Sequence, residues 1–465
     1  MTGMRMTNKS KTGPARILWL YALTNPFSIN LRYNRAGEFL PLKAEKKADA
    51  IDSLTILLKL VEPGCPTEAK VETLRGLDPQ SQKALIAEAE RQGVTLFLYA
   101  MLARLEREHR LGFPHRDKLY QRYVINAGRN TLILHDTEIL LSTLKDAGVS
   151  VAGLKGVYLL ENVYGNIGAR PMNDIDLLVR KSELAACLDV LRKLGYVHTA
   201  YFSIEDENID TKHIPPMRKA GGALLEVHWT LLEEHEPFTI DADALWERTM
   251  PAKIANIDTL ALGVEDLILH LCMHLTYQHY LQLGLRGLLD IALAIDKFAA
   301  EIDWEKLTRI AKSWGAERVT ALSLKLAETQ LKVPVPPGVF FSLAPGGIEP
   351  SMLEGARALL LERVTMEHRL TPDLVNLQAS RSIFTKMKIG LQRVFIPRLA
   401  LARIYNVAPD SPRVLGLYWK RLKYLIRNYG DTLKKLSRDK EAAMPFIEKA
   451  QSSYSLHDWM SGNNH

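Results

Sequence analysis

The hydrophobic pattern changes between Gly148 and Leu231, and this change most limits what the chain can fold into. Before and after this segment, apolar residues recur at the three-to-four-residue spacing of helices. Within it, short apolar runs at 149–154, 174–179 and 223–231 are bounded by glycine or loop residues, with helical stretches between them. Such runs are typical of buried strands. We therefore expect a small α/β unit in which strands and helices alternate.

The helical pattern on both sides of this unit predicts an α+β fold with all-helical flanking parts. A chain of 465 residues exceeds the roughly 100–200 residues of one ordinary domain. We divide it as follows: a basic, partly disordered N-terminal extension (1–45), a helical N-terminal domain (46–147), an α/β core (148–262), a helical domain (263–380) and a basic helical C-terminal segment (381–465). In the run from 117 to 147, helical spacing predicts one inward-facing set: Leu119, Tyr123, Leu132, Ile139, Leu140 and Leu144.

Composition argues against several classes of protein. The three cysteines (Cys65, Cys187 and Cys272) lie far apart, which disfavours a disulfide framework or a structural zinc site and favours a cytoplasmic protein. No apolar run approaches the roughly 20 residues of a transmembrane helix. The first 37 residues contain Lys and Arg but no acid, which is typical of a leader or of a tail. No cleavage pattern predicts a signal peptide.

Positive charge is concentrated near the C-terminus. Between Arg381 and Arg438, fourteen Lys or Arg residues stand against two acids, although the net charge of the whole chain is only +7. Aromatic residues are interleaved with these charges. Three interpretations remain open for residues 381–438: solvated helix faces, binding of RNA or another polyanion, and contact with an anionic membrane surface.

Acidic residues occupy alternate positions on two of the expected strands. Asp174 and Asp176 face one side of their strand, and Glu226 and His228 share one side of a later strand. Two adjacent carboxylates repel each other unless a cation lies between them, and their oxygens suit Mg²⁺. Three converging carboxylates can hold two such ions. This hypothesis requires Glu226 to face the aspartates, and no salt bridge to fill the space between them.

Groups that suit a polyphosphate precede the acidic strand. Lys155 and Gly156 stand where a strand passes into a helix, so backbone N–H groups and the helix dipole would attract an anion. Arg170 could hold a phosphate oxygen in bidentate fashion. His228, on the Glu226 face, is either a phosphate contact or a hydrogen-bonded strand histidine. A weaker candidate of the same kind is His213.

Two further pairs have helical i, i+4 spacing. His270 and His274 have a spacing that can bind zinc, but no third ligand is evident, so we expect them to line a cleft beside the α/β unit or to pack. Arg286 and Asp290 are interpreted as a structural helix pair.

Four segments resemble, in their order, the uncharacterised nucleotidyltransferase family of the polymerase-beta-type superfamily, to which antibiotic nucleotidyltransferases also belong: LKG (154–156), ARPMNDIDLLV (169–179), LGY (194–196) and LLEVHW (224–229). The resemblance runs from about Ser53 to about Asp296. It implies a polymerase-beta-like core that binds Mg²⁺ or Mn²⁺ and an NTP such as ATP. The implied residues are Lys155 and Gly156 for triphosphate, Asp174 and Asp176 for the paired metal carboxylates, and Glu226 for the third acid. Lys-Gly stands here where many members have Gly-Gly or Gly-Ser.

The activity that this resemblance implies is transfer of NMP from an NTP to a hydroxyl acceptor, with release of pyrophosphate by a two-metal mechanism. The acceptor would be a small molecule, a sugar, a protein or RNA. Two alternatives stay open: a non-catalytic nucleotide-binding regulator that retains the fold, and a toxin that nucleotidylates tRNA or protein.

Overall fold

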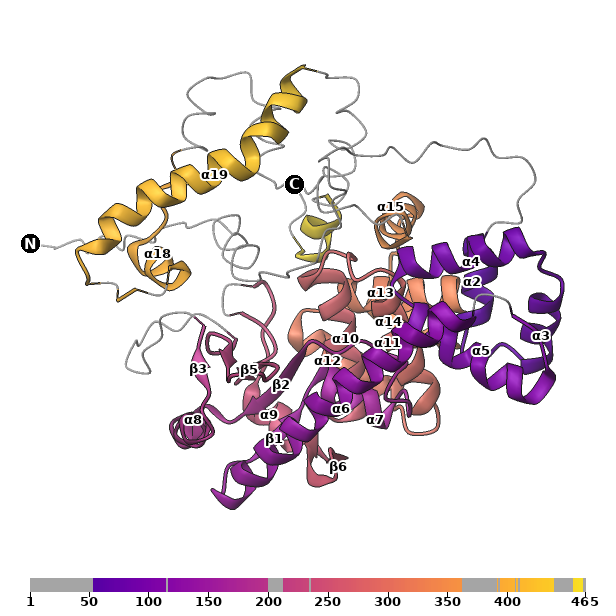
Figure 1. The fold of residues 1–465 in the computed structure, drawn as a ribbon, viewed down its shortest axis with the longest axis horizontal. Coiled ribbons are helices and arrows are strands. Elements are labelled where there is room, and N and C mark those ends of the chain that lie inside the picture. Colours follow the sequence, from indigo (N-terminus) through magenta and orange to yellow (C-terminus); the bar gives the residue numbers. More distant parts are fainter. Residues whose placement is uncertain are drawn as a thin grey trace, which may run out of the picture.

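A computed structural model describes residues 53–113, 116–199, 212–233, 236–361, 391, 394–405, 407–408, 410–438 and 455–462. A mixed sheet lies in the middle and helices flank it, which confirms the predicted α+β class (Figure 1). The predicted basic extension 1–45 lies outside the described residues, as does 362–390, which spans the predicted boundary between the last two segments.

The described chain begins with helices that precede the sheet: α2 (Ser53–Val61), α3 (Thr67–Arg75), α4 (Pro79–Gln92), α5 (Thr95–His109) and α6 (Arg116–Asp146). Helix α4 has clear end signals. The Asp78 carboxylate accepts hydrogen bonds from the backbone N–H groups of Gln80 and Ser81 at its start. Gly93 adopts a left-handed conformation at its end.

Helix α6 buries a different face from part of the prediction. Leu119, Leu140 and Leu144 are buried as expected, but Leu132 is 70% exposed and Ile139 is 39% exposed, so their inward assignment is wrong. At about 100° per residue, both are turned away from Leu140 by roughly 80–100°. The buried face instead carries polar Asn130, whose amide donates hydrogen bonds to the carbonyl oxygens of residues 167 and 170. Helix α6 therefore holds the loop that leads into the acidic strand.

The sheet has seven strands in the order β3-β4-β5-β2-β1-β7-β6. Their bounds are β1 (Val151–Gly153), β2 (Asp174–Val179), β3 (Val197–His198), β4 (Met217–Arg218), β5 (Leu224–His228), β6 (Met250–Ile254) and β7 (Ile257–Ala261). Strand β2 has the predicted bounds, whereas β1 and β5 are shorter than the apolar runs that predicted them. β2 pairs in parallel with β5 and antiparallel with β1. The two acidic strands are therefore direct neighbours.

Short helices connect these strands: α7 (Lys155–Asn162), the 3-10 turn η2 (Lys181–Glu183), α8 (Leu184–Lys193) and α9 (Ala242–Glu247). The helices that follow the sheet are α10 (Val264–Met273), the π-helical turn η3 (His274–Gln278), α11 (Leu285–Lys297), α12 (Trp304–Trp314), α13 (Glu317–Leu331), α14 (Pro337–Leu343), α15 (Pro350–Leu361), α18 (Arg398–Ile404) and α19 (Arg413–Arg438). Within the described residues, no helix has the length and apolarity that crossing a membrane requires.

One continuous core joins the N-terminal helices, the sheet and helices α10–α15. Its buried side chains run from Ile56 to Met460. A second, small cluster lies between α18 and α19 and consists of Leu401, Ala402 and Val414. The sheet and the helical layer that follows it are therefore packed together, whereas α18 and α19 have a core of their own.

Two glycines give opposite expectations for stability. A Cβ atom at Gly263, which precedes α10, would lie 2.6 Å from the backbone oxygen of Arg248, so Gly263→Ala should lower the free energy of unfolding by about 1–3 kcal/mol. Gly128 lies in α6, and a Cβ atom there would meet nothing within 4 Å. Gly128→Ala should therefore raise the free energy of unfolding by about 0.5–1 kcal/mol. Urea unfolding measures both changes. Equal effects of the two substitutions would contradict this packing.

Candidate active site

The acidic residues meet because β2 and β5 pair in parallel and in register. Asp176 is opposite Glu226, and Leu178 is opposite His228. Alternate residues of a strand face the same side, so these partners bring Asp174, Asp176, Glu226 and His228 to one face of the sheet. The first requirement of the sequence hypothesis, that Glu226 faces the aspartates, is therefore met in this structure.

Three of these side chains form a compact buried group. Ligand atoms of Asp176, Glu226 and His228 all lie within 4.8 Å of one another. The three residues are 2%, 8% and 1% exposed, respectively. His228 Nε2 lies 3.1 Å from Asp176 Oδ1 and 3.6 Å from Glu226 Oε2. Asp174 is half-buried on the same face but does not belong to this group. The third member is His228, whereas we expected Asp174.

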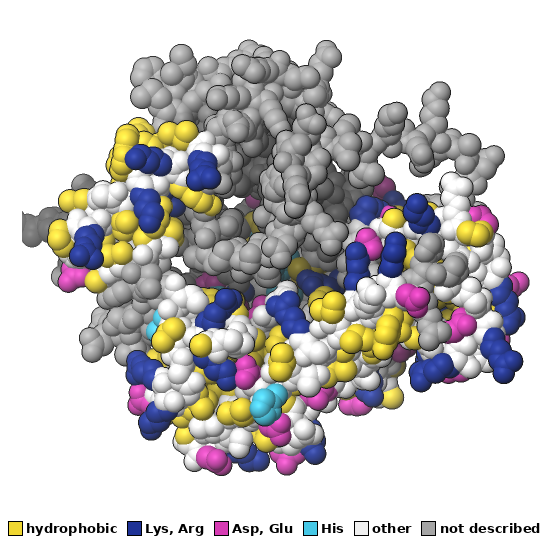
Figure 2. Space-filling view, in the orientation of Figure 1, with side chains coloured by type: hydrophobic (Ala, Val, Ile, Leu, Met, Phe, Trp, Pro, Cys, Tyr) yellow, Lys and Arg dark blue, Asp and Glu magenta, His cyan; other side chains and the backbone are white. Residues whose placement is uncertain are grey.

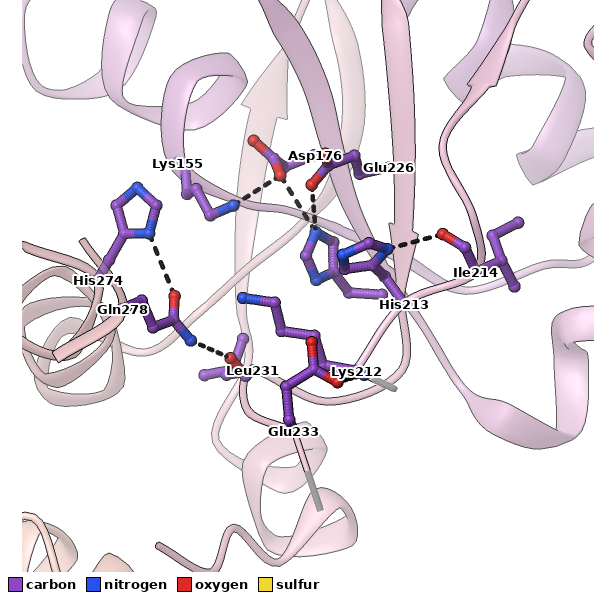
Figure 3. A network of polar contacts seen from close by, with 11 residues as sticks. Lys155, Asp176, Lys212, His213, Ile214, Glu226, Leu231, Glu233, His274 and Gln278 are labelled. Atoms are coloured by element: carbon purple, nitrogen blue, oxygen red, sulfur yellow. Dashed lines mark hydrogen bonds and ion pairs between the residues drawn. The ribbon is translucent and has the colours of Figure 1, made fainter. Parts of the chain in front are cut away.

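A salt bridge reaches the same carboxylate. The Lys155 ammonium lies 2.7 Å from Asp176 Oδ1; the Asp176 side chain is buried and the Lys155 side chain is 12% exposed (Figure 3). Lys155 begins α7 and adopts a φ of 43°, a left-handed conformation that costs a non-glycine residue energy and is often found at functional sites. The second requirement is therefore not met in this structure: before a metal ion could share Oδ1, Lys155 would have to turn away.

The charges around the carboxylates shift their pKa values in opposite directions. Burial, reinforced by the negative charge of Asp176, raises the pKa of Asp174 to about 7. Burial would also raise the pKa of Asp176, but the Lys155 charge and the His228 hydrogen bond outweigh burial and hold it well below its ordinary value. For Glu226, burial would raise the pKa, but the contact with His228 and the charge of His213 outweigh it and lower the pKa to about 2. Asp176 and Glu226 are therefore ionised at neutral pH.

Arg170 forms an ion pair with Asp290. Its Nε and Nη2 atoms donate to the two carboxylate oxygens of Asp290 at 2.8 and 2.9 Å, and Nη1 contacts the Pro171 carbonyl at 3.3 Å. The Tyr164 hydroxyl also donates to Asp290, at 2.7 Å. In this arrangement Arg170 fixes the loop before β2 to α11 and is not directed at a phosphate. Asp290, the expected helix partner of Arg286, is the residue that Arg170 binds.

Close packing explains why position 156 is a glycine. A Cβ atom at this position would lie 3.1 Å from Met172 Cγ and 3.3 Å from an Arg170 terminal nitrogen. The glycine therefore allows the start of α7 to lie against the loop that leads into β2. Helix α7 begins at Lys155, and the phosphate-binding hypothesis places the anion at the first backbone N–H groups of this helix.

The loop before β4 adds a basic group to the same region, and the helical layer adds imidazole groups. Lys212 is 2% exposed and reaches toward the carboxylate group in Figure 3. His270 of α10 is 5% exposed, and neither ring nitrogen has a hydrogen-bond partner among the described residues. Burial lowers the pKa of His270 well below its ordinary value, and the charges of Lys155 and Lys212 lower it further. His274 follows, with its Nδ1 3.2 Å from Gln278 Oε1.

These placements extend the site beyond the predicted residues. The Gln278 amide donates a 3.0 Å hydrogen bond to the Leu231 carbonyl, which ties η3 to the segment after β5. His274 lies on the same side as Lys155 in Figure 3, and the charges of Lys155 and Lys212 reach His270. Within the described chain, neither histidine belongs to a group that could hold a metal. Their i, i+4 spacing was the available signal. Lys212 was missed, because a lysine in a loop carries no distinguishing pattern.

The donor set suits a divalent cation of the harder kind. Asp176 and Glu226 supply ionised oxygens, His228 supplies a nitrogen, and Asp174 adds a nearby carboxylate. Carboxylate oxygens favour Mg²⁺ and Mn²⁺, and an added imidazole is tolerated better by Mn²⁺. The residues fit such an ion provided that Lys155 releases Asp176.

Converging carboxylates on two neighbouring parallel strands are an arrangement that metal-assisted phosphoryl transfer can use. The family model of the uncharacterised nucleotidyltransferases matches residues 78–332, more than half of the chain, and the chain belongs to this family. This confirms the resemblance seen in the sequence motifs. Neither curated proteins nor solved structures gave a match. Family membership supports nucleotidyl transfer from a bound NTP as the general activity.

Proposed function

We propose that this protein transfers NMP from an NTP to a hydroxyl acceptor and releases pyrophosphate. The acceptor oxygen attacks the α-phosphorus, the bond from that phosphorus to the α–β bridging oxygen breaks, and the hydroxyl proton passes to a carboxylate or to solvent. The observation that carries the proposal is the in-register pairing of Asp176 with Glu226, in which two buried, ionised carboxylates lie side by side. A buried pair of this kind needs positive charge beside it.

Different side chains would bind the metal ions, the triphosphate and the acceptor. Asp174, Asp176 and Glu226, with His228, would hold one or two Mg²⁺ or Mn²⁺ ions. Such ions, when bound, neutralise the developing charge on the phosphates and lower the pKa of a bound hydroxyl. Lys155 and the first N–H groups of α7 would hold the triphosphate, and Glu226 would orient the acceptor hydroxyl. Arg170 supports them by fixing the loop before β2.

Lys155 has two partners in this proposal. In this structure its charge neutralises Asp176. When a nucleotide and cation bind, the cation would neutralise Asp176 and the ammonium would turn to the phosphates. A largely enclosed lysine with no partner is unfavourable, so the exchange would keep Lys155 paired in both states.

The activity is tested with purified protein, each of the four α-labelled NTPs, Mg²⁺ and a cell extract. We expect one fraction of the extract to acquire label, and the label to be lost with Asp174→Asn/Asp176→Asn. The assay contains a reductant, because we infer a cytoplasmic protein from its three free cysteines. Labelling that persists in the double variant would refute the assigned site. A labelled tRNA or protein fraction, with growth arrest on expression, would identify a toxin.

One observation favours a second candidate. Because the Lys155 ammonium lies where a cation would bind Asp176, a nucleotide-binding regulator that works without metal is also consistent with this site. Calorimetry with ATP, GTP, CTP and UTP, with and without Mg²⁺, separates the two. Binding that requires Mg²⁺ and is lost in Asp176→Asn supports the enzyme. Equal binding without metal supports the regulator.

Lys155→Met should have two opposite effects. It should weaken NTP binding about 10–100-fold, since a charge-assisted contact with phosphate is lost. Without nucleotide, it should strengthen Mn²⁺ binding, because the ammonium no longer competes for Asp176 Oδ1. Calorimetry measures both affinities.

Lys70→Met is the matched control for this substitution. Lys70 is buried, and its ammonium donates to the Glu62 carbonyl at 2.8 Å in the N-terminal helices. We expect this variant to bind NTP and Mn²⁺ like the wild type. If both lysine variants lost NTP binding equally, the loss would reflect damage to the fold and not a contact of Lys155.

A further inference from the structure

Helices α18 and α19 form a small module with its own core. Val414 of α19 packs on Leu401 and Ala402 of α18. The Tyr418 hydroxyl donates a 2.9 Å hydrogen bond to the Ile396 carbonyl. Among the described residues, these contacts use one face of α19.

Exposed apolar side chains lie along α19 and in the residues just before α18. Six of the fourteen large hydrophobic side chains that are exposed in the described chain lie between residues 391 and 426. On α19, Leu415, Trp419 and Ile426 are 70%, 60% and 63% exposed. At about 100° per residue, they lie within roughly 40° of one another and form one stripe. Figure 2 shows hydrophobic side chains along the part of the surface that α19 occupies in Figure 1.

The same helix carries a basic face beside this stripe. Arg413, Lys420, Lys423 and Arg427 are exposed. The last three are turned from Leu415 by roughly 80–140°. The Lys423 ammonium lies 5.6 Å from the centre of the Trp419 ring, where the apolar and basic faces meet. Over the whole of α19 the only acid is Asp431, against eight Lys or Arg residues.

We propose that α19 docks the protein onto an anionic lipid surface. The helix would lie in the plane of the surface, with the Leu415–Trp419–Ile426 stripe among the acyl chains and the basic face on the lipid phosphates. An exposed apolar stripe flanked by Lys and Arg, on a helix that cannot span a membrane, is the pattern of a helix that binds such an interface. At 26 residues the helix is about 39 Å long, which suits such an orientation.

Lipid explains this surface better than RNA does. Bases stack on aromatic side chains, and Arg and Lys contact the phosphates. Leu415 and Ile426 offer neither kind of contact, but both gain from burial in an apolar layer. The proposal does not depend on the nucleotidyl transfer proposed above, because its contacts lie on α19 and not on β2 or β5.

The test is flotation of the full-length protein with vesicles of phosphatidylcholine, with or without 30% phosphatidylglycerol. We expect binding only to the anionic vesicles, and less of it in 0.5 M salt. The variant Leu415→Ser/Trp419→Ser/Ile426→Ser should bind at least 100-fold more weakly. Lys420→Gln/Lys423→Gln/Arg427→Gln should lose roughly fivefold per charge, on the order of 100-fold in total. The matched control is Val197→Ser/Phe341→Ser, which removes exposed apolar side chains elsewhere and should bind like the wild type.

Each other outcome would overturn the proposal. No flotation with anionic vesicles, or equal flotation with both kinds, would exclude an anionic lipid surface. Loss of a dimer in the serine variant, without vesicle binding, would assign the stripe to a second copy of the chain. Single-stranded RNA binding that survives the serine variant and is lost in the glutamine variant would assign the basic face to a polyanion if vesicles do not bind. Circular dichroism of each variant checks that it is folded.

Discussion

The double substitution Asp174→Asn/Asp176→Asn is expected to lower the rate of NMP transfer by on the order of 10³–10⁴-fold. Asparagine keeps the shape of the side chain but removes the charge that would hold a divalent cation. Asp176 is 2% exposed, so solvent cannot replace the lost carboxylate. The measurement is pyrophosphate release at saturating NTP and Mg²⁺.

The control for this loss is Asp189→Asn/Asp258→Asn, two aspartates on exposed positions away from β2. The rate of NMP transfer by this double variant should remain within about twofold of the wild-type rate, since exposed charges contribute little to the stability of the fold. Because Asp176→Asn also removes the negative charge that pairs with the largely enclosed Lys155, urea unfolding of each variant must accompany the rates. A folded double variant that retains more than a tenth of the wild-type rate would contradict the assignment.

The largest expected effect on stability comes from Asp290→Ala. Its carboxylate accepts two hydrogen bonds from Arg170 and one from Tyr164, all in a nearly buried setting. Removing one partner of a buried ion pair leaves the other charge uncompensated and costs about 3–5 kcal/mol. We expect the free energy of unfolding in urea to fall by that amount.

An exposed pair of the same residue types is the matched control. Arg192 and Asp189 lie 2.8 Å apart on α8, and both side chains are more than half exposed. Asp189→Ala should therefore change the free energy of unfolding by no more than about 1 kcal/mol. The double substitution Arg170→Met/Asp290→Leu should recover most of the loss, because neither charge then remains buried. Equal losses for Asp290→Ala and Asp189→Ala would mean that the buried pair has no special role.

The centre of the candidate site was predictable from sequence because strand geometry is strict. Alternation along 174–179 and 224–228 puts the acids on one side of each strand, and only a parallel, in-register neighbour was needed to bring them together. The order of the family motifs along the sequence indicated that these two strands are neighbours. The α+β class followed from the change of hydrophobic period at Gly148.

Contacts between distant segments were not predictable. Spacing paired Asp290 with Arg286, but Asp290 binds Arg170, which lies 120 positions earlier. Leu132 was assigned inward because it is apolar, whereas polar Asn130 is buried because it can donate to the loop before β2. The Lys155–Asp176 salt bridge was missed in the same way, since no local pattern relates a residue that begins a helix to a strand 21 positions later.

The central claim is that the carboxylates of β2 and β5 bind divalent cations together with a nucleotide. Electron paramagnetic resonance of Mn²⁺, titrated into the protein with a non-hydrolysable NTP analogue, tests it most directly. We expect tight Mn²⁺ binding that depends on the analogue and disappears in both Asp176→Asn and Glu226→Gln. If folded samples of these variants bound Mn²⁺ as the wild type does, or if the wild type bound the analogue equally well in EDTA, the claim would be contradicted.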